Sequence, residues 1–316
     1  MIAKSSALKT RFAAQAVALT LAVAPVLAAP RDGDVIGEMS TTVTGSDDSL
    51  PEIARHFDLG FVELVAANPG LRPWAPGAGH ELVLPTAHIL PKAPRRGVVI
   101  NLDEMRLYYY PASGGDPKTY PLGVGREGHV TPLGTSRIIG KAEQPTWYPP
   151  PSIRAEKPEL PAVVPPGPDN PLGAYALYVG WPGIRIHGTN KPYGVGRRTS
   201  HGCIRLYPED IEALYPQVPV GTPVTVVQQA VKVGWSGGDL YLEVHPSLAQ
   251  ADQLEDHGGT DPEPVPDALS LVRAAAGPED DVRLDQEVIR RAAEERRGYP
   301  VRVTRNPPSP VGTSLP

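Results

Sequence analysis

Thiol chemistry is scarce in this chain, because its 316 residues include a single cysteine, Cys203. One cysteine cannot close a disulfide within the chain, so packing must hold the fold together. Positive charge is also limited, with 30 Lys and Arg against 35 Asp and Glu and a net charge of −5. Since nucleic-acid-binding proteins usually present a basic face, we expect no nucleic-acid partner.

Long apolar runs are absent except near the start. The chain opens with three basic residues and no acidic residue before Asp32, and an apolar run over 12–29 ends in APVLAAP. This order is typical of a secretory signal peptide, which we expect to span 1–28. The run is short and interrupted for a membrane span. We therefore expect an exported mature chain without a span, in which a lone thiol is either buried or reactive.

The first mature segment, residues 35–90, indicates a small α/β module. The pattern predicts helices over Leu50–Phe57 and Phe61–Asn68 and a strand over Glu81–Leu84. Ser49 precedes the first helix and Pro51 stands just inside it, as helix starts favour.

Residues 96–229 indicate a β-rich core. Alternating apolar and polar residues predict one hairpin that turns at Leu102–Glu104 and another that bends at Trp181–Gly183. The stretch GTPVTVV predicts a buried strand, and a helix is expected to begin at Pro208. The proline-rich stretch 145–171 cannot be central strand, and long loops of this kind usually shape a site.

The remainder is expected to contribute less structure. Residues 230–247 read as a strand extension of the core. Residues 248–316 are acidic and rich in proline and glycine, which predicts a largely disordered tail. A helix is expected over Asp281–Arg297, and a docking segment for a wall-assembly partner is the alternative for the tail.

Three residues near the middle of the chain carry candidate chemistry: His187, His201 and Cys203. A thiolate is a good nucleophile, and a neighbouring histidine can take its proton. The residues alone do not rank the two histidines. Gly202 allows close backbone approach to a reacting carbonyl, and Arg205 would project to the same side as Cys203 on a strand, where it could bind a carboxylate.

A zinc site is a rival interpretation, because His201 and Cys203 stand two residues apart. No second cysteine exists to complete a structural site, and the sequence offers no convincing fourth ligand. We therefore expect no metal and no cofactor.

The combination resembles a known family. HGTN at residues 187–190, followed sixteen residues after His187 by the cysteine of SHGCIRL, resembles the signature of the L,D-transpeptidases. The front segment resembles a lysin-motif module through Ser49–Leu50, Ile53–Ala54, Asn68–Pro69 and Leu82–Pro85. The resemblance implies a mainly β, sandwich-like catalytic domain preceded by a small lysin-motif-like α/β module, in the periplasm.

The resemblance also implies roles for individual residues. Cys203 would attack the diaminopimelate–D-Ala bond of a peptidoglycan stem, with His187 as base held by the carbonyl of Gly188. Backbone amides of His201, Gly202 and Cys203 would bind the oxyanion. Residues expected to contact the substrate are Arg205, Ser200, Thr189, Asn190, Tyr193 and Trp147.

The acyl acceptor is not fixed by the sequence. It could be another stem's diaminopimelate, a lysine of an outer-membrane lipoprotein, a free D-amino acid or water. The last would make the protein a hydrolytic L,D-carboxypeptidase, and a catalytically silent wall-binding protein is a further alternative.

Overall fold

The computed structural model describes residues 33–278, 280 and 283–305. The expected signal peptide and residues 306–316 lie outside this range. Among the described residues, no helix is long and apolar enough to cross a membrane.

The front segment is a βααβ unit. Strand β2 (Ser40–Val43) pairs antiparallel with β3 (Glu81–Leu84), and helices α1 (Leu50–His56) and α2 (Phe61–Ala67) lie between them in sequence. Both predicted helices and the predicted strand are confirmed. Asn68 joins the two parts, because its side chain exchanges hydrogen bonds with the backbone of Val83 at 2.7 and 2.8 Å. A further pair, β1 (Val35–Ile36) and β4 (His88–Ile89), flanks the unit.

The middle of the chain forms a mixed sheet, so the mainly β prediction is confirmed. Among the described residues, eight strands follow the order β13-β11-β10-β9-β14-β5-β6-β7. Their bounds are β5 (Gly97–Asn101), β6 (Arg106–Tyr110), β7 (Lys118–Pro121), β9 (Gly134–Glu143), β10 (Tyr175–Val179), β11 (Arg185–His187), β13 (Ile204–Arg205) and β14 (Pro223–Val227). Both predicted hairpins form, as β5–β6 and β10–β11.

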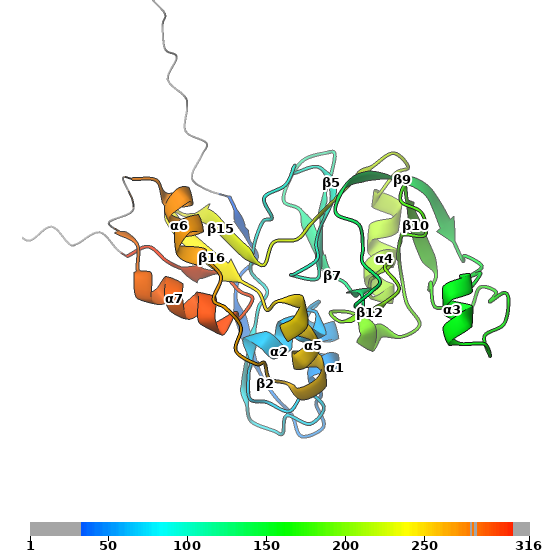
Figure 1. The fold of residues 1–316 in the computed structure, drawn as a ribbon, viewed down its shortest axis with the longest axis horizontal. Helices are drawn as coiled ribbons and strands as arrows, with labels where there is room; N and C mark the ends of the chain where they lie inside the picture. Colours follow the sequence, from blue (N-terminus) through cyan, green and yellow to red (C-terminus); the bar gives the residue numbers. More distant parts are fainter. Residues whose placement is uncertain (1–32, 279, 281–282, 306–316) are drawn as a thin grey trace, which may run out of the picture. The chain divides into compact units, whose positions relative to one another are not determined.

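Strand β9 divides this sheet into two halves (Figure 1). Its first residues, Gly134–Arg137, pair with β14, and the residues from Ile138 onward pair with β10. Apolar side chains of both halves share one buried core, which also takes Ile211 and Leu214 of α4 (Pro208–Leu214). A single bent strand thus lets two half-sheets cover a common core, as the sandwich-like prediction requires.

The proline-rich stretch is an ordered loop. It contains the short helix α3 (Pro151–Glu156), and Trp147 and Val164 exchange backbone hydrogen bonds of 2.9 Å across its base. Asn170 is fully buried there and donates to three backbone carbonyls, those of Pro145, Val164 and Pro165.

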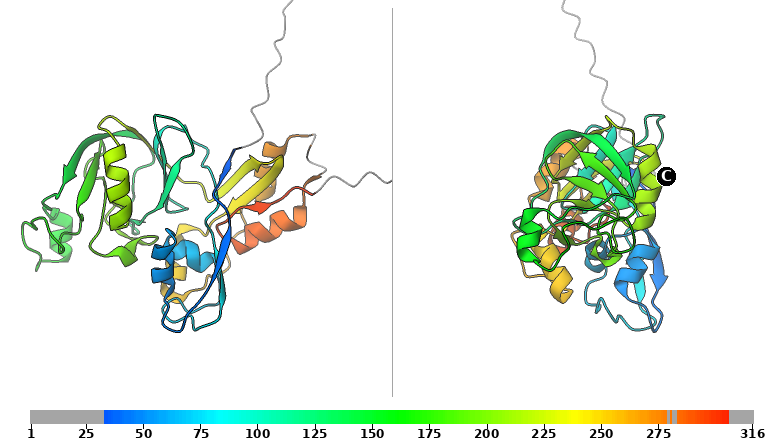
Figure 2. Two further views of the ribbon diagram at one scale, coloured as in Figure 1. Left: turned by 180° about the vertical axis from the view of Figure 1, so that it is seen from behind. Right: turned by 90° about the vertical axis from the view of Figure 1, so that its right-hand side faces the viewer.

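The strands predicted over 230–247 form, and they lie in a sheet separate from the eight-stranded one. Strands β15 (Val231–Ser236) and β16 (Asp239–Val244) pair with each other and with β17 (Val301–Arg302) in a separate sheet. Figure 2 shows this sheet with the orange helices beside it. These helices are α6 (Ala268–Ala276) and α7 (Gln286–Glu295), and they share a second buried core with the sheet.

The prediction of a largely disordered tail is wrong for the described part of 248–305. Helix α5 (Leu248–His257) precedes α6 and α7, the last of which confirms the helix expected there. Ser247, Asp267 and Asp285 cap these helices, because each accepts a hydrogen bond from a backbone amide three residues later.

Several contacts bind the parts of the chain to one another. Ala251 and Leu254 of α5 join the same core as the front unit. Arg106 of β6 and Glu63 of α2 form a buried ion pair at 2.7 Å, and the ammonium of Lys232 lies 2.8 Å from Glu104. The loop after His187 is held too, because Gly196 accepts a 3.1 Å hydrogen bond from the amide of Val62.

Candidate active site

The site is built on the parallel pairing of β11 with β13. In its register His187 is the partner of Arg205 and Ile186 is the partner of Ile204. Partners in a sheet project to the same face. Cys203 directly precedes β13 and stands two residues before Arg205. The strand pairing therefore places His187, Cys203 and Arg205 at neighbouring positions of one sheet edge.

His187 is a buried imidazole with a fixed tautomer. Its Nδ1 lies 2.5 Å from the carbonyl oxygen of Gly188. A carbonyl only accepts hydrogen bonds, so Nδ1 carries the proton of the neutral ring and Nε2 keeps the lone pair. Burial, followed by the charge of Arg205, lowers the pKa of His187 to about 3. The ring is consequently neutral over the whole physiological range.

Cys203 is partly buried, and its thiol donates a hydrogen bond to the carbonyl of Gly183 at 3.3 Å. Gly183 lies in the turn between β10 and β11, so the hairpin that ends in His187 also supports the thiol.

The backbone around Cys203 is fixed by two buried hydroxyls. Thr131 donates to the carbonyl of Gly202 at 2.9 Å, and Ser200 donates to the carbonyl of Cys203 at 2.5 Å. Each bond sets the plane of one peptide unit and so aims the amide on its other side. Gly202 has φ +92°, a conformation that favours glycine. Ser200 thus supports the nucleophile from inside the fold, which differs from the predicted substrate contact.

A cavity of about 260 Å³ lies beside this segment. Its lining includes five of the predicted residues, which are Trp147, Thr189, Asn190, His201 and Arg205. The proline-rich loop supplies further wall residues: Ile153, Lys157, Leu160, Val164 and Asp169. Lys157 and Lys191 add positive charge to that of Arg205, which suits a ligand that carries carboxylates.

One aromatic candidate, Tyr193, lies elsewhere. Its ring packs edge-on against Trp74 at 6.4 Å, and its hydroxyl donates to Glu52 at 3.4 Å, so it contacts the front unit.

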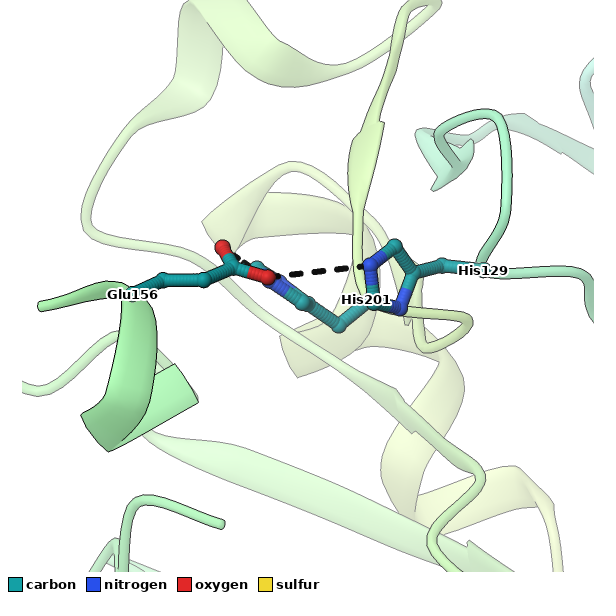
Figure 3. A group of neighbouring side chains, drawn as sticks. All are labelled: His129, Glu156 and His201. Carbon is teal, nitrogen blue, oxygen red and sulfur yellow. Dashed lines mark hydrogen bonds and ion pairs between the residues drawn. The ribbon is translucent and has the colours of Figure 1, made fainter. Parts of the chain in front are cut away.

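The sequence reasoning missed a group of polar residues around His201. Nε2 of His201 lies 3.0 Å from Glu156 and 3.0 Å from the guanidinium of Arg126, and its ring is 4.5 Å from that of His129 (Figure 3). These residues come from different segments, and no spacing in the sequence connects them. The contact of Thr131 with Gly202 was missed for the same reason, because the two residues are far apart in the sequence.

Comparison with known proteins identifies the family of this chain. Residues 95–226 match the YkuD family model, described as an L,D-transpeptidase catalytic domain. The chain is 38% identical to the probable L,D-transpeptidase YcfS of Escherichia coli K12, over 96% of this chain and 98% of that protein. The chain belongs to the L,D-transpeptidase family. It is therefore an enzyme of the transferase class.

Another relative and one solved structure give further matches. The probable L,D-transpeptidase YbiS of E. coli K12 is 39% identical over 94% of this chain and 98% of that protein. Among solved structures, the NMR structure of the catalytic domain from the E. faecium L,D-transpeptidase has 24% identity and a TM-score of 0.35, and the match covers 43% of this chain and 100% of that chain.

Proposed function

We propose that this L,D-transpeptidase cleaves the diaminopimelate–D-Ala bond of a peptidoglycan tetrapeptide stem and transfers the stem to an amine. The observation that supports this most is the strand pairing that sets His187 opposite Arg205, with Cys203 directly before the second strand. A nucleophile, a base and a carboxylate-binding group then meet at one sheet edge.

In the first half-reaction, the thiol of Cys203 loses its proton to Nε2 of His187, and the sulfur attacks the diaminopimelate carbonyl. The carbonyl oxygen becomes an oxyanion, which the amides of His201, Gly202 and Cys203 stabilise. The C–N bond then breaks and the imidazolium returns its proton to the departing amine. D-alanine is released, and the diaminopimelate carbonyl remains bound to Cys203 as a thioester.

In the second half-reaction, an acceptor amine attacks the thioester and gives its proton to His187. The new amide forms and the free thiol is restored. The acceptor is another stem's diaminopimelate, which yields a 3→3 cross-link, or a lysine of an outer-membrane lipoprotein.

The proline-rich loop favours transfer over hydrolysis in this scheme. Trp147, Ile153 and Leu160 line the cavity from the loop side, so they limit the access of water to the thioester. Arg205, with Thr189 and Asn190 on the facing wall, binds the polar part of the stem.

We also propose that residues 1–28 direct the chain to the periplasm and that the front unit is a lysin-motif-like module that contacts the wall. The βααβ order of the front unit and the Ser-Leu, Ile-Ala and Asn-Pro positions support this assignment.

The test is to incubate the mature protein with a tetrapeptide muropeptide and to follow products and intact protein by mass spectrometry. We expect D-alanine, a cross-linked dimer and an acyl adduct on Cys203, all abolished by Cys203→Ala and by His187→Ala. Circular dichroism should show that Cys203→Ala keeps the fold.

The other outcomes are equally informative. Release of D-alanine without a dimer points to water or to a lipoprotein lysine as acceptor, and addition of a lysine peptide distinguishes the two. If neither D-alanine nor an adduct forms with a reduced thiol, the silent wall-binding protein is the correct description.

A further inference from the structure

Four polar side chains converge on one point beside His201. The Nη2 atom of Arg126 lies 2.7 and 2.6 Å from the two carboxylate oxygens of Glu156. The same atom lies 3.0 Å from Nε2 of His201 and 3.3 Å from Nε2 of His129. One cationic nitrogen therefore lies within 3.3 Å of two imidazole nitrogens and a carboxylate. Figure 3 shows these three surrounding side chains.

The three surrounding groups offer donor atoms of the kinds that bind metal ions. One donor atom from each of His129, Glu156 and His201 can be chosen so that all three atoms lie within 4.8 Å of one another. Two imidazole nitrogens and a carboxylate oxygen are the donors that a divalent first-row metal ion such as Zn²⁺ takes, with a fourth position left for water.

We propose that His129, Glu156 and His201 bind a divalent first-row transition-metal ion at the position now held by the guanidinium of Arg126. Metal–ligand bonds of about 2.0–2.2 Å require the donors to close in by roughly 0.5–1.3 Å from their distances to the guanidinium nitrogen, most of all His129 at 3.3 Å. The donors can do so because they stand on three separate loops or helix ends. Arg126 can leave because its side chain is 43% exposed.

The site would connect the loop to the nucleophile's segment. Glu156 is the last residue of α3 in the proline-rich loop, His129 follows β8 (Val124–Gly125), and His201 stands two residues before Cys203. A bound cation would replace the hydrogen bonds of Arg126 by three coordinate bonds. These bonds would hold the proline-rich loop over the cavity. This inference depends on the described side chains and not on the acceptor or substrate proposed above.

The experiment is isothermal titration calorimetry of the untagged mature protein with Zn²⁺, all in the Cys203→Ala background so that the thiol cannot bind metal. We expect one Zn²⁺ per chain, with binding weakened at least about tenfold by His129→Ala and by Glu156→Gln. His56→Ala, which removes an exposed histidine elsewhere, should leave the affinity unchanged.

Arg126→Met gives the decisive arm, because it removes the cation that competes for the three donors. We expect it to tighten Zn²⁺ binding, and we expect Zn²⁺ to raise the melting temperature of Cys203→Ala and of Arg126→Met but not of His129→Ala. If Arg126→Met instead fails to tighten binding, or if His129→Ala and His56→Ala bind equally well, the cluster is an arginine-centred latch and the proposal is wrong.

Discussion

The sulfur of Cys203 lies 3.3 Å from the carbonyl oxygen of Gly183, which accepts its hydrogen bond. In this resting arrangement the proton of the thiol is directed to the turn of the β10–β11 hairpin. The same hairpin ends in His187, whose Nδ1 is bound to the carbonyl of Gly188. Attack on a substrate therefore requires the thiol to leave Gly183 and to deliver its proton to the imidazole, a rearrangement that a bound stem can favour.

The charge of Arg205 should control the protonation of His187. Burial and then Arg205 lower the pKa of His187 from its ordinary 6.5 to about 3, and Arg185 contributes less. We expect Arg205→Gln to raise this pKa more than Arg185→Gln does, measured by NMR titration of the His187 ring. Equal shifts in the two variants would show that the strand pairing does not couple the two groups.

The same shift has a consequence for stability. Because the folded state holds His187 neutral while the unfolded chain protonates it near pH 6.5, its contribution to stability is complete above that pH. It should be lost as the pH falls from 6.5 towards 3. Urea unfolding at several pH values between 7 and 4 gives the free energy of unfolding as a function of pH. This free energy should fall less steeply with decreasing pH for His187→Gln than for the parent protein.

The hydroxyl of Thr131 should matter for turnover through the peptide it holds. Thr131→Val removes the donor to the carbonyl of Gly202. Thr222→Val is the matched control, because it removes a buried 2.7 Å bond to the carbonyl of Pro219. Each should cost about 1–3 kcal/mol in free energy of unfolding. If the amide of Cys203 binds the oxyanion, only Thr131→Val should lower kcat, by roughly tenfold or more. Equal kcat values for the two variants would show that the hydroxyl of Thr131 does not support an oxyanion-binding amide.

Gly202 offers a second matched pair. Gly202 and Gly221 both have φ +92°, but only Gly202 adjoins the nucleophile. Alanine at either position should destabilise the fold by roughly 1–2 kcal/mol, measured by denaturant unfolding. We expect Gly202→Ala alone to reduce acylation of Cys203, followed by mass spectrometry. A parallel loss of acylation in Gly221→Ala would indicate a general effect of destabilisation.

Two neighbouring carboxyl groups, those of Asp58 and Asp210, should make the fold less stable as the pH rises from acid to neutral. Asp58 follows α1 and Asp210 lies in α4, and burial together with the charge of Asp58 raises the pKa of Asp210 to about 8. The folded state then binds a proton that the unfolded chain releases above pH 3.8, so stability falls as the pH rises from 3.8 to 8.

Asp210→Asn should remove this penalty. We expect the variant to gain more than about 1 kcal/mol over the parent protein at pH 9 relative to pH 5, from urea unfolding at both values. Glu212→Gln, on the exposed side of the same helix, should show no such gain. If the free energy of unfolding changes between pH 5 and pH 9 by the same amount in both variants, ionisation of Asp210 does not destabilise the fold.

The sequence by itself determined the local elements and predicted the reactive residues. Alternating apolar residues required the β5–β6 and β10–β11 hairpins, and the spacing of His187, Gly202 and Cys203 marked the catalytic segment. These features depend on neighbours within a few residues, so a local pattern carries them. The lysin-motif assignment of the front unit and the signal peptide remain predictions.

Only the tertiary structure decided what depends on distant segments. Asp267 and Asp285 read as solvated acidic residues, and only the packed helices show that they are caps. Arg126, His129 and Glu156 meet His201 because separate loops are held together by a core that no short window of sequence contains. The physical reason is that local propensity describes which elements form, whereas burial and side-chain contact across the chain decide which of those elements face one another.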